Sequence, residues 1–100
     1  MLESEDHWIR LYLPVFVEFT EDGAMLPRSL VWTDGRVYKI DRVLDVISSP
    51  ALKAGGQGDR YKLEVHGQIR YLFFEHNVDY GNEKPGRWFM EWKDESNGTA

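Results

Sequence analysis

The amino-acid sequence predicts an all-β fold, either a small antiparallel six-stranded barrel or a strongly bent sheet with at most one short helical turn. Several segments alternate apolar and polar residues with a period of two, which is typical of half-buried strands. Glycine-bearing turns separate these segments at short intervals, and no stretch of ten or more residues has a helical period. We favour the barrel because six strands in so short a chain would otherwise leave two edges to protect.

The first predicted strand begins at Trp8 and ends at Phe19. Six apolar residues occupy every odd position in it: Ile9, Leu11, Leu13, Val15, Val17 and Phe19. Pro14 lies on the opposite parity, and because proline has no N–H it implies either an edge strand or a bend that splits the strand into two halves. The residues Glu21-Asp22-Gly23 supply turn chemistry that reverses the chain.

The next hairpin organises the centre of the chain. A two-residue Asp34-Gly35 turn would set Trp32 opposite Val37 and send Tyr38 to the other face from Leu30. We favour a three-residue loop, Thr33-Asp34-Gly35, which sets Leu30 opposite Tyr38 and Trp32 opposite Arg36. The third loop position needs a left-handed backbone, which Gly35 adopts without steric cost. The same pairing lets the Arg36 guanidinium lie across the Trp32 ring.

Residues 43–47 are ambiguous because their apolar side chains fall on both parities. We interpret them as the end of a strand with a bulge at Asp41-Arg42, and a short helical turn is the alternative. The glycine-rich segment 48–59 that follows is predicted to be a loop. It runs into Asp59 and a strand rather than into a helix, so it is not predicted to bind phosphate.

A second hairpin joins strands 60–65 and 68–76, and 87–93 is the last strand. A loop of Val65-His66-Gly67 would pair Tyr61 with Tyr71 and Leu63 with Ile69. Residues 8–93 are thus predicted to form a single β domain, SH3-like in size. Residues 1–7 are predicted to be a flexible amino terminus, and 94–100 a disordered tail with no apolar group to bury.

Composition excludes several kinds of chemistry. The chain has no cysteine, so disulfides, thiolate metal sites and thiol nucleophiles are unavailable. Its acidic start has no apolar run long enough for a signal sequence or a membrane span, which predicts a cytoplasmic protein that does not contact the membrane. The formal net charge is −5. Residues 28–70 nevertheless carry eight basic and five acidic residues, a local balance of +3.

No catalytic or metal centre is predicted. The three histidines, His7, His66 and His76, have no partner at metal-ligand spacing, and no cofactor motif is present. The carboxylate pairs, such as Asp41 with Asp45, show no sign of the burial that would shift their pKa values. We therefore predict a protein that is not an enzyme and that binds no metal or cofactor.

The order of the central residues resembles a family of small uncharacterised bacterial β domains. The similar pattern is Leu30-x-Trp32-x-x-Gly35-Arg36-x-Tyr38-x-Ile40-x-x-Val43, followed by Tyr61, Leu63, Tyr71-Leu72-Phe73 and Trp88. Some members of that family look like companions of Y-family-like DNA polymerase proteins. The resemblance implies a fold and a bacterial setting but no activity, and the acidic balance of this chain weakens the inference about DNA.

The surplus of aromatic residues points to a binding surface. Trp8, Tyr12 and Phe16 lie opposite the apolar face of the first strand, with Arg10 among them. Half-exposed rings of this kind predict a module that binds a protein partner or itself. The alternative is a nucleic-acid accessory module that uses the basic middle segment, although the net charge disfavours it. The candidate binding residues are Trp8, Arg10, Tyr12, Trp32, Arg36, Tyr38, Arg42, Arg60, Arg70 and Trp88.

Overall fold

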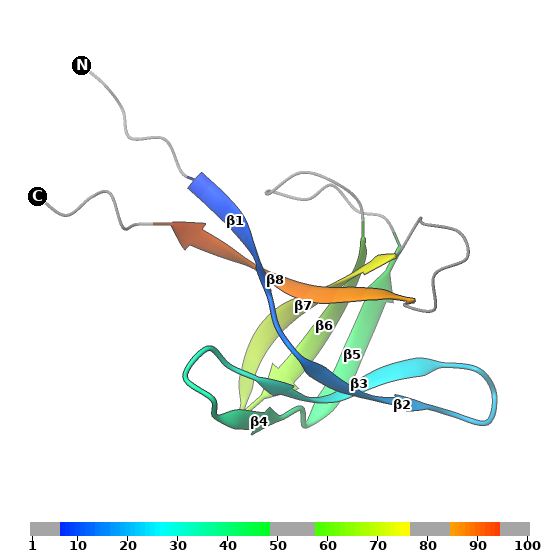
Figure 1. The fold of residues 1–100 in the computed structure, drawn as a ribbon. Coiled ribbons are helices and arrows are strands. Elements are labelled where there is room, and N and C mark those ends of the chain that lie inside the picture. The colour runs from blue at the N-terminus through cyan, green and yellow to red at the C-terminus, as the bar shows by residue number, and fades with distance from the viewer. Residues whose placement is uncertain (1–6, 49–57, 77–84, 95–100) are drawn as a thin grey trace, which may run out of the picture.

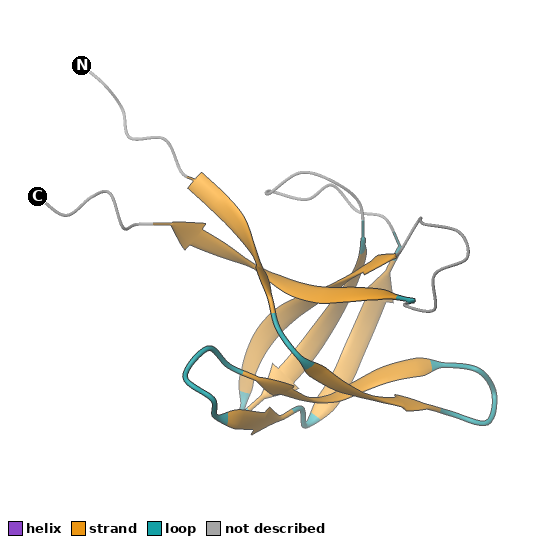
Figure 2. Ribbon diagram, in the orientation of Figure 1, coloured by secondary structure: helices purple, strands orange, loops and turns teal. Residues whose placement is uncertain are grey.

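The computed structural model describes residues 7–48, 58–76 and 85–94, which form two antiparallel sheets (Figures 1 and 2). The strands are β1 (His7–Tyr12), β2 (Val15–Phe19), β3 (Met25–Val31), β4 (Val37–Lys39), β5 (Arg42–Ile47), β6 (Asp59–Val65), β7 (Gln68–His76) and β8 (Gly86–Asp94). One sheet has the order β1-β8-β7-β6-β5 and the other the order β2-β3-β4. Of the predicted flexible ends, 1–7 and 94–100, only His7 in β1 and Asp94 in β8 are described. Residues 1–6, 49–57, 77–84 and 95–100 lie outside the described residues.

The prediction of an all-β antiparallel fold is confirmed. The described residues contain no helix, so the helical alternative for 43–47 is wrong, and β5 occupies that segment. The described residues form no closed barrel, and they contain eight strands rather than the six predicted. Two of the predicted strands are each divided into two shorter strands. In both cases the strand before the division belongs to one sheet and the strand after it belongs to the other.

The described residues contain no helix that is long and apolar enough to cross a membrane.

The first division lies at Leu13 and Pro14, where the chain bends. The Leu13 N–H still donates to the Trp88 carbonyl oxygen, at 3.1 Å, as part of the five-stranded side. One residue later, the Pro14 carbonyl oxygen accepts the Val31 N–H at 3.0 Å, on the three-stranded side. Because proline donates no hydrogen bond, the ladder of one sheet can end here while the other begins. Of the two readings of Pro14, the bend is the one observed.

The second division lies at Ile40 and Asp41. The Ile40 N–H donates to the Arg28 carbonyl oxygen at 2.9 Å, and the Asp41 N–H donates to the Glu64 carbonyl oxygen at 2.8 Å. The chain therefore changes its pairing partner between two successive residues. The bulge predicted at Asp41-Arg42 lies slightly later, at Leu44, where the register of β5 against β6 shifts.

The two hairpins differ in their turns. In the first, Leu30 pairs with Tyr38 and Gly35 has a φ of +87°, as predicted. In the second, Tyr61 pairs with Leu72 and Leu63 pairs with Arg70, so the predicted register is wrong by one residue.

The two-residue turn His66-Gly67 explains this difference. Both residues have positive φ, +51° and +75°, as a type I′ turn requires, and such a turn matches the right-handed twist of the strands. The Asp41 carboxylate accepts the His66 N–H at 2.9 Å, which links this turn to the second division, at Ile40 and Asp41. The one-residue shift sends Ile69 and Tyr71 to the opposite face of the sheet from Tyr61 and Leu63.

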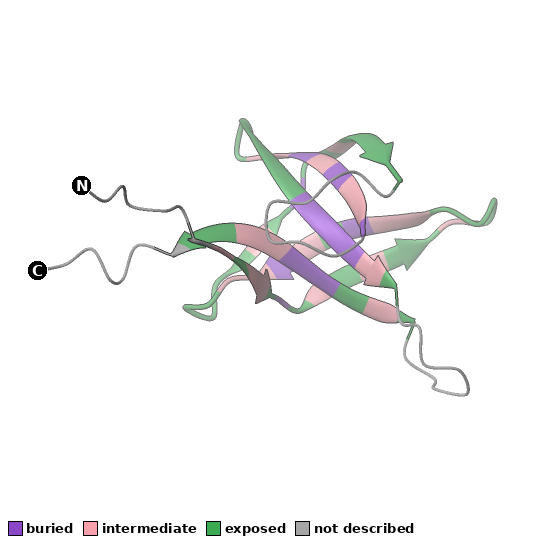
Figure 3. Ribbon diagram, turned by 90° about the horizontal axis from the view of Figure 1, so that it is seen from above, coloured by how far each residue is buried: buried purple, intermediate pink, exposed green. Residues whose placement is uncertain are grey.

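The core lies between the two sheets (Figure 3). Trp88 is buried within it, with its ring centroid 5.0 Å from that of Tyr61 and 4.9 Å from that of Phe74. The other buried members of this cluster are Ile40, Leu63 and Leu72. Residues of β2 and β3, among them Val15, Val17 and Met25, pack against it and close the core on the side of the smaller sheet.

Candidate binding surface on the five-stranded sheet

One face of the five-stranded sheet packs on the core, and the opposite face, called here the outer face, points away from β2–β4. Its centre is a row of five residues that are directly paired across all five strands. Tyr12 pairs with Phe89, Phe89 with Phe73, Phe73 with Arg60, and Arg60 with Ile47. We call these five residues the cross-sheet row. Paired residues share a face of the sheet, so the row forms one continuous surface.

The aromatic half of the row makes a second, thin apolar layer. The Phe73 and Phe89 rings stack with an interplanar angle of 14° and a centroid distance of 5.2 Å, and the Tyr12 ring lies 5.6 Å from that of Phe89. Phe73 and Phe89 are buried, although both lie on the outer face. The Arg10 guanidinium, 5.3 Å from the centroid of the Phe89 ring, is part of their cover.

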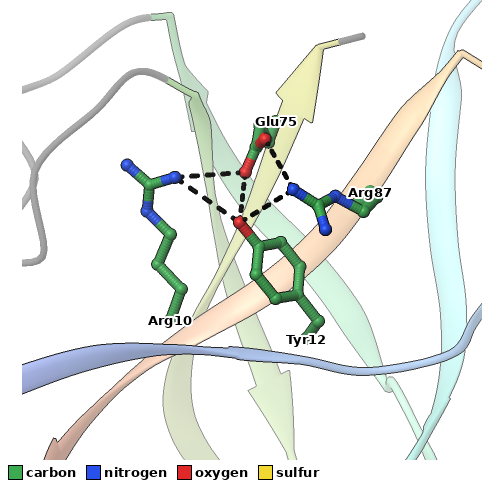
Figure 4. A network of polar contacts seen from close by, with 4 residues as sticks. All are labelled: Arg10, Tyr12, Glu75 and Arg87. Atoms are coloured by element: carbon green, nitrogen blue, oxygen red, sulfur yellow. Dashed lines mark hydrogen bonds and ion pairs between the residues drawn. The ribbon is translucent and has the colours of Figure 1, made fainter.

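A polar cluster of four residues lies beside this aromatic layer: Arg10, Tyr12, Glu75 and Arg87 (Figure 4). The Tyr12 hydroxyl donates to Glu75 Oε1 at 2.5 Å, and Arg10 Nη1 donates to the same oxygen at 3.3 Å. Arg87 Nη2 donates to Glu75 Oε2 at 3.1 Å and to the Tyr12 hydroxyl oxygen at 3.3 Å. The two arginines therefore share one carboxylate, and three strands, β1, β7 and β8, supply the cluster.

The cluster keeps Glu75 charged. Burial by itself would raise the pKa of this carboxyl group, but the hydrogen bonds from Tyr12 and Arg87 and the charges of Arg87 and Arg10 outweigh it, so the pKa is lowered. The pKa of Arg10 is raised, chiefly by its hydrogen bond with Tyr12. A carboxylate between two guanidinium groups fixes their positions at neutral pH.

Guanidinium groups also cover the exposed rings of the face. The Arg87 guanidinium lies 4.0 Å from the centroid of the Tyr12 ring, and the Arg60 guanidinium lies 4.9 Å from that of Tyr71. Nη2 is the only Arg87 atom that makes a side-chain hydrogen bond to another described residue; its Nε and Nη1 make none within the described part of the chain. The Arg87 side chain is 63% exposed. The outer face therefore presents guanidinium groups that lie against aromatic rings.

The charges of the described residues are unevenly distributed over the surface. The strand register places six basic and four acidic residues on the outer face, a balance of +2. They are Arg10, Arg42, Arg60, Lys62, Arg87 and Lys93, with Asp45, Glu64, Glu75 and Glu91. The described residues as a whole hold ten basic and eleven acidic residues, a net charge of −1, so those outside the outer face carry −3. Within the described part of the chain, the outer face is thus the basic side.

Half of the candidate binding residues lie on this face: Trp8, Arg10, Tyr12, Arg42 and Arg60. Arg42 pairs with Glu64, with 2.8 Å between Nη2 and Oε1, while Trp8 lies opposite Lys93 in the pairing of β1 with β8. The register confirms that Trp8, Arg10 and Tyr12 share one face of β1, as their alternation predicts.

The other five candidates lie elsewhere. Trp88 is buried in the core, so it is not available to a partner. The Trp32 ring packs on Trp92 at 5.0 Å, and the Tyr38 ring meets the His66 ring at 5.7 Å. Arg36 pairs with Asp34 in its own hairpin, and Arg70 is bonded to Gln68 within its own strand. The structure does not bring these five together with the outer face.

Three residues of this surface, Glu75, Arg87 and Tyr71, are not among the predicted candidates. The predicted three-residue loop of the second hairpin pairs Tyr71 with Tyr61, whereas the observed register places these two rings on opposite faces. The pairing of Glu75 with Arg87 joins β7 to β8 across the undescribed segment 77–84, so no turn in the sequence could set its register. The opposite charges at the two positions are the signal in the sequence that agrees with this pairing.

His66 and His76, the two histidines whose side chains are described, do not form a centre with other ligands within the described residues. His76 Nε2 lies 2.9 Å from Asp59 Oδ2, and His66 lies in its turn against Tyr38. No group of three histidine, aspartate or glutamate residues in 7–48, 58–76 and 85–94 could hold a metal ion.

In comparisons with known proteins, no family model matches the chain, and neither a curated protein nor a solved structure matches it. The resemblance to small bacterial β domains stays a prediction.

Proposed function

We propose that this chain is a non-catalytic interaction module that binds an extended acidic segment of a protein partner on its outer face. The observation that carries the proposal is the surface built around the cross-sheet row. Exposed apolar side chains stand there between guanidinium groups, and Tyr12, Ile47, Ile69 and Tyr71 are each 37–44% exposed. Aromatic residues and arginine are the types enriched in the cores and hot spots of protein interfaces.

The charge of the face supports an acidic partner. A balance of +2 on the outer face, against −3 for the other described residues, favours contact with acidic side chains at this face over the rest of the described surface. The apolar side chains would meet apolar residues of the partner. A segment that alternates acidic and apolar residues fits both requirements.

Two observations favour a protein over a single-stranded nucleic acid. The Tyr12 and Tyr71 rings, which could stack on bases, are each covered by a guanidinium group. The acidic residues Glu64, Glu75 and Glu91 stand between the basic ones, which interrupts any track for a phosphate backbone. A protein interface tolerates such a mixed pattern and gains specificity from it.

The proposal can be tested by selection from a displayed library of short random peptides against the immobilised chain. We expect enrichment of peptides in which aspartate or glutamate alternates with apolar residues. The selected peptides should lose about tenfold or more in affinity for Tyr71→Ala, which removes an exposed ring and uncovers Arg60. Phe19→Ala is the matched control, because Phe19 is 68% exposed but lies on the smaller sheet.

Three outcomes would overturn the proposal. Selection may yield no peptide whose binding depends on Tyr71, or it may enrich lysine and arginine. A labelled single-stranded oligonucleotide may instead bind the chain and lose affinity with Tyr71→Ala, which would assign the face to nucleic acid. The salt dependence of that complex would be steep between ~50 and ~200 mM salt.

A further inference from the structure

We infer that Arg87 is the residue that receives a side-chain carboxylate of the partner, and that Glu75 competes with that carboxylate from within the chain. This inference rests on the proposed function and names the contact through which an acidic segment would be recognised. It concerns the polar cluster shown in Figure 4.

Arg87 is held in place before any ligand arrives. Its guanidinium plane lies 4.0 Å from the centroid of the Tyr12 ring, and its Nη2 atom is fixed by hydrogen bonds to the Tyr12 hydroxyl oxygen and to Glu75 Oε2. A long side chain ordinarily loses rotamer freedom when it binds an anion. Because these contacts already restrict Arg87, less of that loss remains for the binding step.

Arg87 also keeps the donors that a carboxylate needs. Within the described part of the chain, its Nε and Nη1 atoms make no hydrogen bond, and its side chain is 63% exposed. An incoming carboxylate can therefore accept charge-assisted hydrogen bonds without displacing the existing ones. Arg10, on the other side of Glu75, is only 26% exposed and lies over the Phe89 ring. It is therefore less accessible to a ligand than Arg87 is.

The other arginines that form ion pairs are placed differently. Arg28 pairs with Glu18 at 2.6 Å, and Arg42 pairs with Glu64 at 2.8 Å. In each of these pairs one carboxylate faces one guanidinium, whereas Glu75 divides its charge between Arg10 and Arg87. Glu75 therefore compensates the charge of Arg87 less fully than a carboxylate that paired with Arg87 alone. A second carboxylate is attracted to the positive charge that remains.

Glu75 is an internal competitor because its own negative charge repels the incoming one. The low pKa of Glu75 means that this charge is present at neutral pH. Replacing Glu75 with glutamine removes the charge but keeps a side chain that can still accept hydrogen bonds from Arg87 and Tyr12. The Glu75→Gln variant should therefore bind a carboxylate more tightly than the natural chain does.

Acetate is a suitable probe, because it offers the carboxylate alone. In ¹⁵N-labelled protein, the Arg87 Nε–Hε signal should move in a saturable way as sodium acetate replaces sodium chloride at constant ionic strength. The apparent acetate Kd should fall about two- to fivefold in Glu75→Gln, in the range expected for one exposed charge interaction. Glu64→Gln is the matched control, because it makes the same charge change on the same face beside Arg42 and should leave the Arg87 titration unchanged.

Several results would overturn the inference. The Arg87 signal may not move, all arginine signals may move alike, or Glu64→Gln may strengthen acetate binding as much as Glu75→Gln does. Failure here is distinct from failure of the proposed function. If selected acidic peptides bind and depend on Tyr71 but are insensitive to Arg87→Gln and Glu75→Gln, the module stands and this contact is wrong. If acetate titrates Arg87 as expected and no peptide is selected, the contact stands and the module fails.

Discussion

At the scale of single residues, the outer face depends on side chains that support one another's position. Tyr12 illustrates this, since its ring lies under the Arg87 guanidinium while its hydroxyl donates to Glu75. The ring supplies an apolar support and the hydroxyl a polar anchor, which is the usual division of labour in a half-buried tyrosine. Phenylalanine at this position would keep the support for Arg87 and lose the anchor for Glu75.

The lowered pKa of Glu75 predicts a pH dependence of stability. A carboxyl group whose pKa is lower in the folded than in the unfolded state stabilises the fold above its unfolded value. That contribution is lost as the pH falls below the ordinary value of 4.5 and through the lowered pKa of the folded state. We therefore expect the free energy of unfolding of Glu75→Gln to fall less steeply between about pH 5 and pH 3 than that of the natural chain.

Urea unfolding at a series of pH values, followed by tryptophan fluorescence, measures this difference. Some acid sensitivity should remain in the variant, because the pKa of Asp22 is also lowered, chiefly by a hydrogen bond from Thr20. Parallel pH profiles for Glu75→Gln and the natural chain would show that the cluster does not hold Glu75 as described.

At the scale of elements, β5 is an edge strand that needs protection. It pairs with β6 on one side, and the edge strand presents three apolar residues, Leu44, Val46 and Ile47, that are 38–45% exposed. An exposed apolar edge invites pairing with another chain. Two features oppose this: the bulge at Leu44 interrupts the ladder, and the Asp45 carboxylate accepts the N–H of Val46 at 2.9 Å.

Asp45→Ala should therefore promote self-association. The substitution frees the Val46 N–H and removes a charge from the edge, and both changes favour an added strand. Sedimentation velocity over a range of protein concentrations should show dimers or larger species at concentrations where the natural chain stays smaller. Asp34→Ala, which removes a charge from the tip of the first hairpin, should have no such effect. If both variants sediment like the natural chain, Asp45 does not guard the edge.

The two hairpins show which parts of the fold can be predicted from sequence. The first was predicted correctly because four large residues of one parity admitted only one loop length, and Gly35 fits the left-handed position. The second has apolar residues on both faces of β7, namely Leu72 and Phe74 on one and Tyr71 and Phe73 on the other, so parity could not select a register. A non-glycine residue with positive φ, such as His66, is also uncommon.

The candidate binding surface was predictable only where it lies within one strand. The alternation of β1 placed Trp8, Arg10 and Tyr12 together, because a single strand fixes its own faces. The contact of Arg10 and Arg87 with Glu75 joins residues 65 and 12 positions apart. Such contacts depend on the order of strands in the sheet, which alternation within a strand does not determine.

At the scale of the whole molecule, two divided strands tie the sheets to one core. The chain passes from the five-stranded sheet to the three-stranded sheet at Leu13-Pro14, and it passes back to the five-stranded sheet at Ile40-Asp41. The described part of the chain buries only ten large hydrophobic side chains, and one cluster of six lies between the sheets. A small domain has little stability in reserve, so loss of one core residue should affect both sheets together.

Leu63 is the residue that tests this dependence. It is 1% exposed, lies at the centre of the cluster between the sheets, and belongs to β6 near the middle of the larger sheet. Leu63→Ala removes buried methyl groups and leaves a cavity, which typically costs about 2–5 kcal/mol, a large share of the ~5–15 kcal/mol that keeps a domain folded. Leu44→Ala makes the same chemical change at a position that is 40% exposed, and it should cost about 1 kcal/mol or less.

Two measurements of stability can distinguish one core shared by both sheets from two sheets that are stabilised independently. Far-ultraviolet circular dichroism during urea unfolding reports both sheets, while an amide hydrogen-exchange measurement can follow the Val31 N–H of the smaller sheet alone. If the sheets share one core, Leu63→Ala lowers the midpoint of the first and the protection of the second by the same free energy. If protection at Val31 is unchanged while the larger sheet is destabilised, the smaller sheet does not depend on the common core. The two sheets would then be separate units that unfold independently.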